Sequence, residues 1–172
     1  GEYGYDLLMP KPQLEATRDR LIAAAQRFGG RVVTRDVLDL CALEAGFFNV
    51  RRHVREGLTP VELQLQWRVS AGRAYPGSAS IADRRKAPRG RIALFAAAKE
   101  PPLDAAITLA GGQVGTVLDA GWSFARDEAI GVALLDTALS HAGLTGFACG
   151  DFHLRTWRLT AVISRGVAVD PQ

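Results

Sequence analysis

The stretch between residues 47 and 58 concentrates side chains whose chemistry is easy to recognise. It contains three arginines and a histidine, at positions 51, 52, 55 and 53, within "NVRRHVRE". Guanidinium groups bind phosphates and carboxylates through paired N–H donors. The stretch therefore predicts either a basic loop that binds an anion or a solvated loop in a scaffold joint.

A second basic run, "DRRKAPRGR" at 83–91, leaves the same two alternatives open. Aromatic residues do not interleave with either run, as they do in proteins that bind single-stranded nucleic acids. The net charge of +3 is mild, and nucleic-acid binding usually needs clustered charge. We expect no nucleic-acid partner, with RNA binding through 83–91 as a weaker hypothesis.

Other reactive residue types are scattered. His53, His141 and His153 have no Cys or carboxylate at ligand spacing, so we expect no metal site. There is no Gly-x-Ser-x-Gly elbow for a serine nucleophile, and "GGQVG" lies between two strand-like segments, unlike a nucleotide-binding loop. The catalytic residue is therefore unknown from the sequence.

The composition describes a soluble protein with a packed core. Of 172 residues, 48% are apolar and 23% are charged, and no apolar run approaches the roughly 18 residues of a membrane span. Cys41 and Cys149 share no metal-type spacing, which predicts reduced, buried thiols in a cytoplasmic protein. Cys41 is predicted to be a small core residue on an apolar helical face.

Two helices are predicted in the first part of the chain. An apolar stripe that includes Leu14, Leu21 and Phe28 predicts a helix that stops at Gly29-Gly30. Arg35 to Ala45 predicts a second helix, which Gly46 ends.

Strand-like and turn patterns surround these helices. Tyr5 to Met9 predicts a short strand. Thr59-Pro60 predicts a short helical turn with Glu62 close behind, and Leu63 to Val69 alternates apolar and polar residues as a half-buried strand does.

The composition changes between Ser70 and Gly90, where we place a domain boundary near 84–90. From Arg91 onward, short strand-like runs alternate with turns, the last being "DFHLRTWRLTAVIS" at 151–164. Gly111-Gly112 separates two of these runs as a hairpin does. The second half therefore predicts a small antiparallel sheet or barrel.

Taken together, five segments resemble, in order, the glycine-cleavage T-protein family of tetrahydrofolate-dependent aminomethyltransferases. "GEYGYDLLMP" is similar to its Gly-Glu-x-Gly-Tyr-Glu strand, and "RDVLDLCALEAG" to its Arg-Asp-x-Leu-Arg-Leu-Glu-Ala-Gly helix. "TPVELQLQW" matches its Thr-Pro-x-Glu-x-x-Leu-x-Trp joint, and "YPGSASI" its Phe-x-Gly helix start. "GGQVGTVLDAGWSF" with "AIGVALL" resembles its carboxyl-terminal hairpin.

The resemblance implies an α+β fold in two parts. Residues 1–86 would be the C-terminal part of the family's folate-binding α/β region, and residues 87–172 its C-terminal antiparallel β-barrel domain. Family members are about twice this length, so the chain is expected to be a C-terminal fragment. The family's catalytic aspartate would lie outside it, and the fragment alone would be inactive.

Two cofactor-binding residues follow from the resemblance. Asp6 stands where the family has a glutamate that hydrogen-bonds the pterin ring, and the alternative is a solvent-facing aspartate. Trp67, at the edge of the joint, could border the pterin or the aminobenzoyl group, and the alternative is core packing.

Two departures put the activity in doubt. Leu38 and Ala42 replace the two arginines of the family helix, and leucine cannot pair with a carboxylate. One hypothesis is that the lost charge has moved to Arg51, Arg52 or Arg55.

The resemblance therefore implies transfer of a methyl or aminomethyl unit from a small donor to tetrahydrofolate. The donor would be free or delivered by a carrier protein. The alternative is a non-catalytic folate-binding or interaction module of the same fold.

Overall fold

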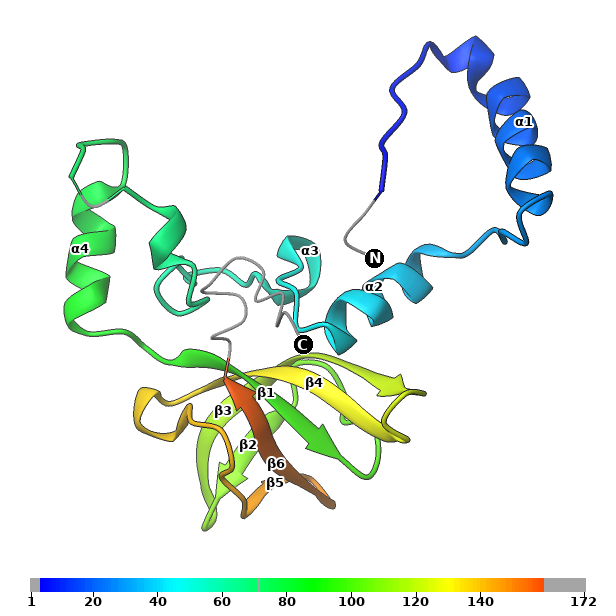
Figure 1. Ribbon diagram of the computed structural model, residues 1–172. Helices are drawn as coiled ribbons and strands as arrows, with labels where there is room; N and C mark the ends of the chain where they lie inside the picture. Colours follow the sequence, from blue (N-terminus) through cyan, green and yellow to red (C-terminus); the bar gives the residue numbers. More distant parts are fainter. Residues whose placement is uncertain (1–3, 71, 160–172) are drawn as a thin grey trace, which may run out of the picture. The chain divides into compact units, whose positions relative to one another are not determined.

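Residues 4–70 and 72–159 are described by the computed structural model of the chain (Figure 1). Contacts divide the chain into two compact units, residues 1–41 and 42–172. The helices are η1 (Lys11–Gln13), α1 (Leu14–Gln26), α2 (Arg35–Glu44), α3 (Val50–His53), η2 (Gln66–Arg68), α4 (Ser78–Lys86) and η3 (Thr137–Leu139). The strands are β1 (Arg91–Ala97), β2 (Ala106–Leu109), β3 (Gly112–Ser123), β4 (Glu128–Leu135), β5 (Phe147–Cys149) and β6 (Phe152–Leu159).

The first predicted helix is confirmed as α1, and glycine ends it as expected. Gly29 has a φ of +74°, and the Gly30 N–H donates to the Ala25 carbonyl oxygen at 2.9 Å, which closes the helix as a left-handed cap does. The apolar stripe is not buried, however: Leu14 is 52% exposed and Phe28 is 91% exposed. Local signals therefore set this helix without burial of its apolar side.

The predicted strand from Tyr5 to Met9 is wrong, because residues 4–10 have no regular secondary structure. A strand needs a neighbouring backbone for its N–H and C=O groups. The described residues pair no strand with this segment. Residues 1–3 of the family-like segment "GEYGYDLLMP" lie outside the described residues.

The second predicted helix is confirmed as α2, and Gly46, with a φ of +69°, follows its end. The Phe47 N–H donates to the Ala42 carbonyl oxygen at 2.8 Å. The prediction that Cys41 is a core residue is wrong, because its side chain is exposed. Leu43, two positions later, is buried, and residues two apart on a helix face different directions.

The Thr59-Pro60 turn is confirmed, but the predicted strand from Leu63 to Val69 is wrong. The Leu65 N–H donates to the Pro60 carbonyl oxygen at 2.7 Å, which continues the turn helically, and η2 follows. Gln64 has a φ of +54°, and its side-chain amide donates to the Ile92 carbonyl oxygen at 2.9 Å. These hydrogen bonds, and not the alternation of apolar and polar residues, determine the backbone conformation of this segment.

The predicted antiparallel barrel is confirmed. In the described part of the chain the strands close in the order β1-β4-β3-β2-β5-β6. The Gly111-Gly112 hairpin is confirmed between β2 and β3, with Ala110 and Gly111 at positive φ. Residues 160–164 of the predicted last run lie outside the described residues.

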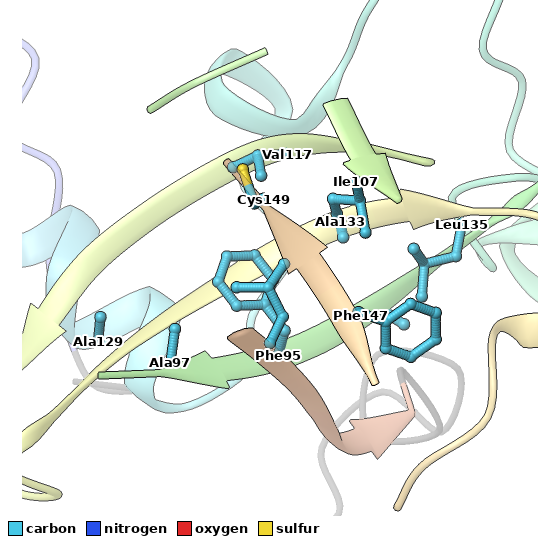
Figure 2. Close-up of a cluster of buried hydrophobic side chains, with 11 residues drawn as sticks. Phe95, Ala97, Ile107, Val117, Ala129, Ala133, Leu135, Phe147 and Cys149 are labelled. Atoms are coloured by element: carbon cyan, nitrogen blue, oxygen red, sulfur yellow. The ribbon is translucent and has the colours of Figure 1, made fainter. Parts of the chain in front are cut away.

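The barrel interior holds one of two buried clusters (Figure 2). Phe95 fills space beside Gly131, where an added Cβ would clash with its ring and with the Asp119 carbonyl oxygen. The interior members are Ala93, Phe95, Ala97, Ile107, Val117, Ala129, Ala133, Leu135, Phe147, Cys149 and Leu154. The alanines of this cluster leave room for two phenylalanine rings, Phe95 and Phe147, in a narrow barrel interior.

The second cluster lies on the outer side of β1, β3 and β4. Ile92 and Leu94 alternate with the interior residues of β1, and Leu43 and Leu63 pack on this side. Strands covered on both faces are apolar throughout, unlike half-solvated strands. This explains the continuous apolar run "IALFAA".

The region of changed composition between Ser70 and Gly90 contains a helix, α4. Helix α4 begins after Gly77, which has a φ of +89°. This agrees with the helix start that the family resemblance implied. The assignment of residues 1–86 and 87–172 to two family domains stays a prediction. No helix among residues 4–70 and 72–159 has the length and apolar character to cross a membrane.

Candidate functional site

An irregularity in β3 places one carboxylate on the outside of the barrel. Val117 pairs with Ala133 and Asp119 pairs with Val132, so Leu118 is an extra residue between these pairs. Such a β-bulge shifts the alternation of the strand by one position. Leu118 belongs to the outer cluster, and Asp119 follows it opposite the outer residue Val132. Asp119 is nevertheless buried, at 2% exposure.

Helix α3 covers this carboxylate with two side chains. Arg52 Nε and Nη2 donate to Asp119 Oδ1 at 2.8 and 2.6 Å. His53 Nε2 lies 3.2 Å from the other oxygen, Oδ2, and His53 is 1% exposed. Both carboxylate oxygens are therefore occupied by groups of one short helix.

The surroundings of His53 define its tautomer. The Asn49 N–H donates to His53 Nδ1 at 3.2 Å. Because Nδ1 accepts a hydrogen bond, the proton resides on Nε2, which can then donate to Asp119. The Phe48 ring meets the imidazole edge to face, with centroids 5.6 Å apart. The imidazole is therefore fixed on three sides.

Opposing effects act on the pKa of the Asp119 carboxyl. Burial raises the pKa, but hydrogen bonds from His53 and Arg52 and the positive charge of Arg52 lower it. The net result is a pKa below the ordinary value. Asp119 is thus an ionised anchor for α3.

The Arg55 side chain also donates its hydrogen bonds to groups of the protein itself. Its Nε donates to Asp104 at 2.9 Å, and its Nη2 donates to the Leu118 carbonyl oxygen at 2.9 Å, on the bulged residue itself. Arg52 and Arg55 therefore hold the 47–58 stretch as a scaffold joint. The hypothesis of a relocated anion-binding charge stays a prediction for Arg51, whose N–H is capped by the Asn49 side chain at 3.1 Å.

A second buried carboxylate organises the Thr59 turn. Glu62 is 0% exposed, and its Oε2 accepts the Thr59 N–H at 3.0 Å and the Thr59 hydroxyl at 2.5 Å. The Val61 N–H donates back to Thr59 Oγ1, so the pair forms a capping box. Glu62 Oε1 accepts the Arg89 N–H and lies 3.3 Å from Arg84 Nε.

Burial raises the pKa of Glu62, but the Thr59 and Arg89 hydrogen bonds lower it below its ordinary value. Arg84 and Arg89 belong to the 83–91 basic run. Part of that run is therefore structural, since it closes the turn around Glu62.

The two predicted cofactor-binding residues are both exposed. Asp6 lies in the irregular segment of the first unit. Beside it, Leu7 and Met9 line an apolar depression of about 300 Å³ together with α1 residues Leu14 and Leu21. Trp67, in η2 of the second unit, is 43% exposed. Each side chain is available to a ligand within its own unit.

The Cys149 thiol and the possible metal ligands do not define a further site in the described residues. Burial raises the pKa of the Cys149 thiol in the barrel interior, so it is a packing residue. Among the described residues, no three His, Cys, Asp or Glu side chains gather as a metal site would require.

Sequence reasoning missed Asp119, although a signal was present. Asp119 is the acidic residue within the apolar strand segment "TVLDAG", and a buried carboxylate needs partners. The sequence could raise that question, but it could not show that α3 supplies the partners.

These features define a class of fold: helical segments, a Thr-x-x-Glu turn and a closed antiparallel barrel of six described strands. Among solved structures, the chain is similar to the crystal structure of glycine cleavage system aminomethyltransferase T from Bartonella henselae. The TM-score is 0.77 at 17% sequence identity, and the match covers 91% of this chain and 45% of that chain.

This chain therefore spans less than half the length of that structure. No family model matches the sequence, and no curated protein matches it. The likeness establishes the fold, with the barrel corresponding to the carboxyl-terminal barrel-like domain of the aminomethyltransferase.

Proposed function

We propose that this chain forms part of a protein that binds tetrahydrofolate and transfers a methyl or aminomethyl unit to it. The observation that carries the proposal is the match to an aminomethyltransferase over 91% of the chain, together with five family-like segments in the same order. The donor would be a small methylated or aminomethylated molecule, delivered free or on a carrier protein. We further propose a cytoplasmic location.

In this proposal Asp6 accepts hydrogen bonds from the pterin edge, which offers N–H donors to a carboxylate. Its exposure and the apolar depression lined by Leu7 and Met9 support this role. Trp67 packs its indole against a flat part of the cofactor. Bound tetrahydrofolate would accept the one-carbon unit, and these residues would orient it. No catalytic residue is assigned within the chain.

Calorimetric titration of the full-length gene product with 5-formyltetrahydrofolate tests the proposal. Loss of a hydrogen bond to a charged group costs about 1.5–3 kcal/mol, so Asp6→Asn should weaken binding by about tenfold or more. Asp6→Glu, which restores the family residue, should bind at least as tightly as the parent. Asp36→Asn, an exposed carboxylate in the first turn of α2, is the matched control.

The alternative is a non-catalytic folate-binding module, which the replacement of the family arginines by Leu38 and Ala42 favours. Binding without turnover of any methyl or aminomethyl donor would support that alternative. Absence of binding would contradict both functions.

A further inference from the structure

The positive charge of the chain is concentrated in one stretch. Residues 66–91 contain seven Arg and Lys residues and one acidic residue, a net charge of +6. The rest of the chain contains 14 basic and 17 acidic residues, a net charge of −3. The excess positive charge of the whole protein therefore comes from this stretch.

In the folded chain, an aromatic side chain lies beside some of these basic residues. Arg85, on α4, donates from Nη2 to the Gln66 carbonyl oxygen at 3.4 Å, next to Trp67. The Arg68 guanidinium lies 4.8 Å from the centre of the Trp67 ring. In the sequence no aromatic residue interrupts the 83–91 run, but the folded chain places one beside it. We call Trp67, Arg68, Arg85 and Lys86 the basic platform.

The cations of the platform are accessible. Arg68, Arg85 and Lys86 are exposed. Lys86 pairs with Asp83 at 3.1 Å, but both side chains are more than three-quarters exposed, and such pairs contribute little. Arg84, by contrast, faces the fully buried Glu62. The stretch thus divides into structural arginines and cations that an external polyanion can reach.

We propose that the basic platform binds single-stranded nucleic acid. Proteins that bind such strands combine cations that contact phosphates with an exposed aromatic ring on which a base stacks, often beside an arginine. The platform presents both, because Trp67 is 43% exposed beside Arg68, and α4, which Arg85 joins to the residue before Trp67, carries the exposed cations Arg85 and Lys86. An acidic protein partner would also use the cations and the indole, so competition with a polyglutamate peptide is needed to distinguish the two partners. The proposal does not depend on folate binding.

Fluorescence anisotropy of a fluorescein-labelled 15-nucleotide oligouridylate, titrated with the full chain between 20 and 200 mM KCl, tests this. Binding should weaken as salt rises. The double variant Arg85→Gln with Lys86→Gln should reduce the slope of log K against log salt by about 1.4, because each neutralised phosphate of a single strand adds about 0.7 to that slope.

The matched control is Arg20→Gln with Arg27→Gln, which removes the same charge from exposed positions of the first unit and should leave the slope unchanged. Trp67→Ala should weaken binding about tenfold, which is the effect of removing the stacking of one base, and Trp67→Phe should retain most of the affinity. Folate binding makes no use of Arg85 or Lys86, so these variants separate the two proposals.

Three results would overturn the proposal. They are no binding at 20 mM KCl, an equal reduction of the slope in the control variant, and a polyglutamate peptide that competes as well as unlabelled oligouridylate while Trp67→Ala has no effect. The last result would indicate an acidic protein partner instead.

Discussion

The two units of the molecule differ in how far their apolar side chains are buried. In the first, Leu21 and Phe28 of the α1 region are 48% and 91% exposed. In the second, Phe95 and Leu94 on β1 are buried on the two faces of one strand. The first unit therefore leaves the apolar side chains of the α1 region largely exposed, whereas the barrel unit packs its apolar side chains against one another. Stability should depend far more on the barrel.

The sharpest test of this contrast is Phe95→Ala. The ring fills the narrow interior beside Gly131, so its removal leaves a cavity and should lower the free energy of unfolding by about 3–5 kcal/mol. Urea unfolding followed by circular dichroism measures this. A loss below about 1 kcal/mol would contradict the assignment of the barrel interior as the main core.

Asp119→Asn should have the next largest effect. It removes the negative charge that accepts hydrogen bonds from Arg52 and His53. Because Arg52 is 34% exposed, the cost should be about 2 kcal/mol, below that of breaking a fully buried ion pair. The same urea experiment measures it. If the variant unfolds as the parent does, α3 is not anchored by this carboxylate.

The pH dependence gives Asp119 a second test. Its pKa is lowered in the folded protein, so the stabilisation is fully present above the unfolded-state pKa of about 4 and is lost as pH falls through the folded-state pKa. The difference between parent and Asp119→Asn should therefore be largest at about pH 7 and shrink below about pH 4. A difference that grows as the pH falls would contradict a lowered pKa of Asp119 in the folded protein.

Glu62→Ala should cost about 2 kcal/mol, because it leaves buried donors of Thr59 and Arg89 without their acceptor. Glu56→Ala, an exposed residue of the same joint, should change stability by no more than about 0.5 kcal/mol. Thermal unfolding of the pair provides the measurement. Equal effects would show that the Thr59 turn does not depend on its carboxylate.

The smallest effect is expected in the first unit. Phe28→Ser should change the free energy of unfolding by no more than about 0.5 kcal/mol, because the ring is 91% exposed. Denaturation of the full chain tests this value. A loss above about 1 kcal/mol would mean that the ring is covered in solution, and the contrast between the units would fail.

The parts of the fold that could be predicted from the sequence are those with local causes. Gly29 and Gly46 end helices by their own backbone conformations, and Gly111 marks a hairpin in the same way. The predicted strand at Leu63–Val69 failed because the Thr59–Glu62 capping box starts a helical turn that the alternating pattern cannot oppose. The strand at Tyr5–Met9 failed because pairing depends on residues far away in the sequence.

The candidate site was less predictable, for the same reason. Asp6 and Trp67 came from family-like segments, and their binding roles remain predictions. The partners of Asp119 lie 66 and 67 residues away, so no local pattern could reveal them. Likewise, the proximity of Arg85 to the Trp67 segment depends on how α4 and η2 meet.

The extra residue in β3 makes the joint sensitive to the register of one strand pair. If Leu118 were opposite Val132, with no bulge, Asp119 would lie opposite Gly131 and its carboxylate would be directed toward the ring of Phe95. Such a one-residue slip would bring an unpaired charge into the interior and release α3 at once. The pairing of β3 with β4 therefore fixes the barrel interior and the attachment of α3 together.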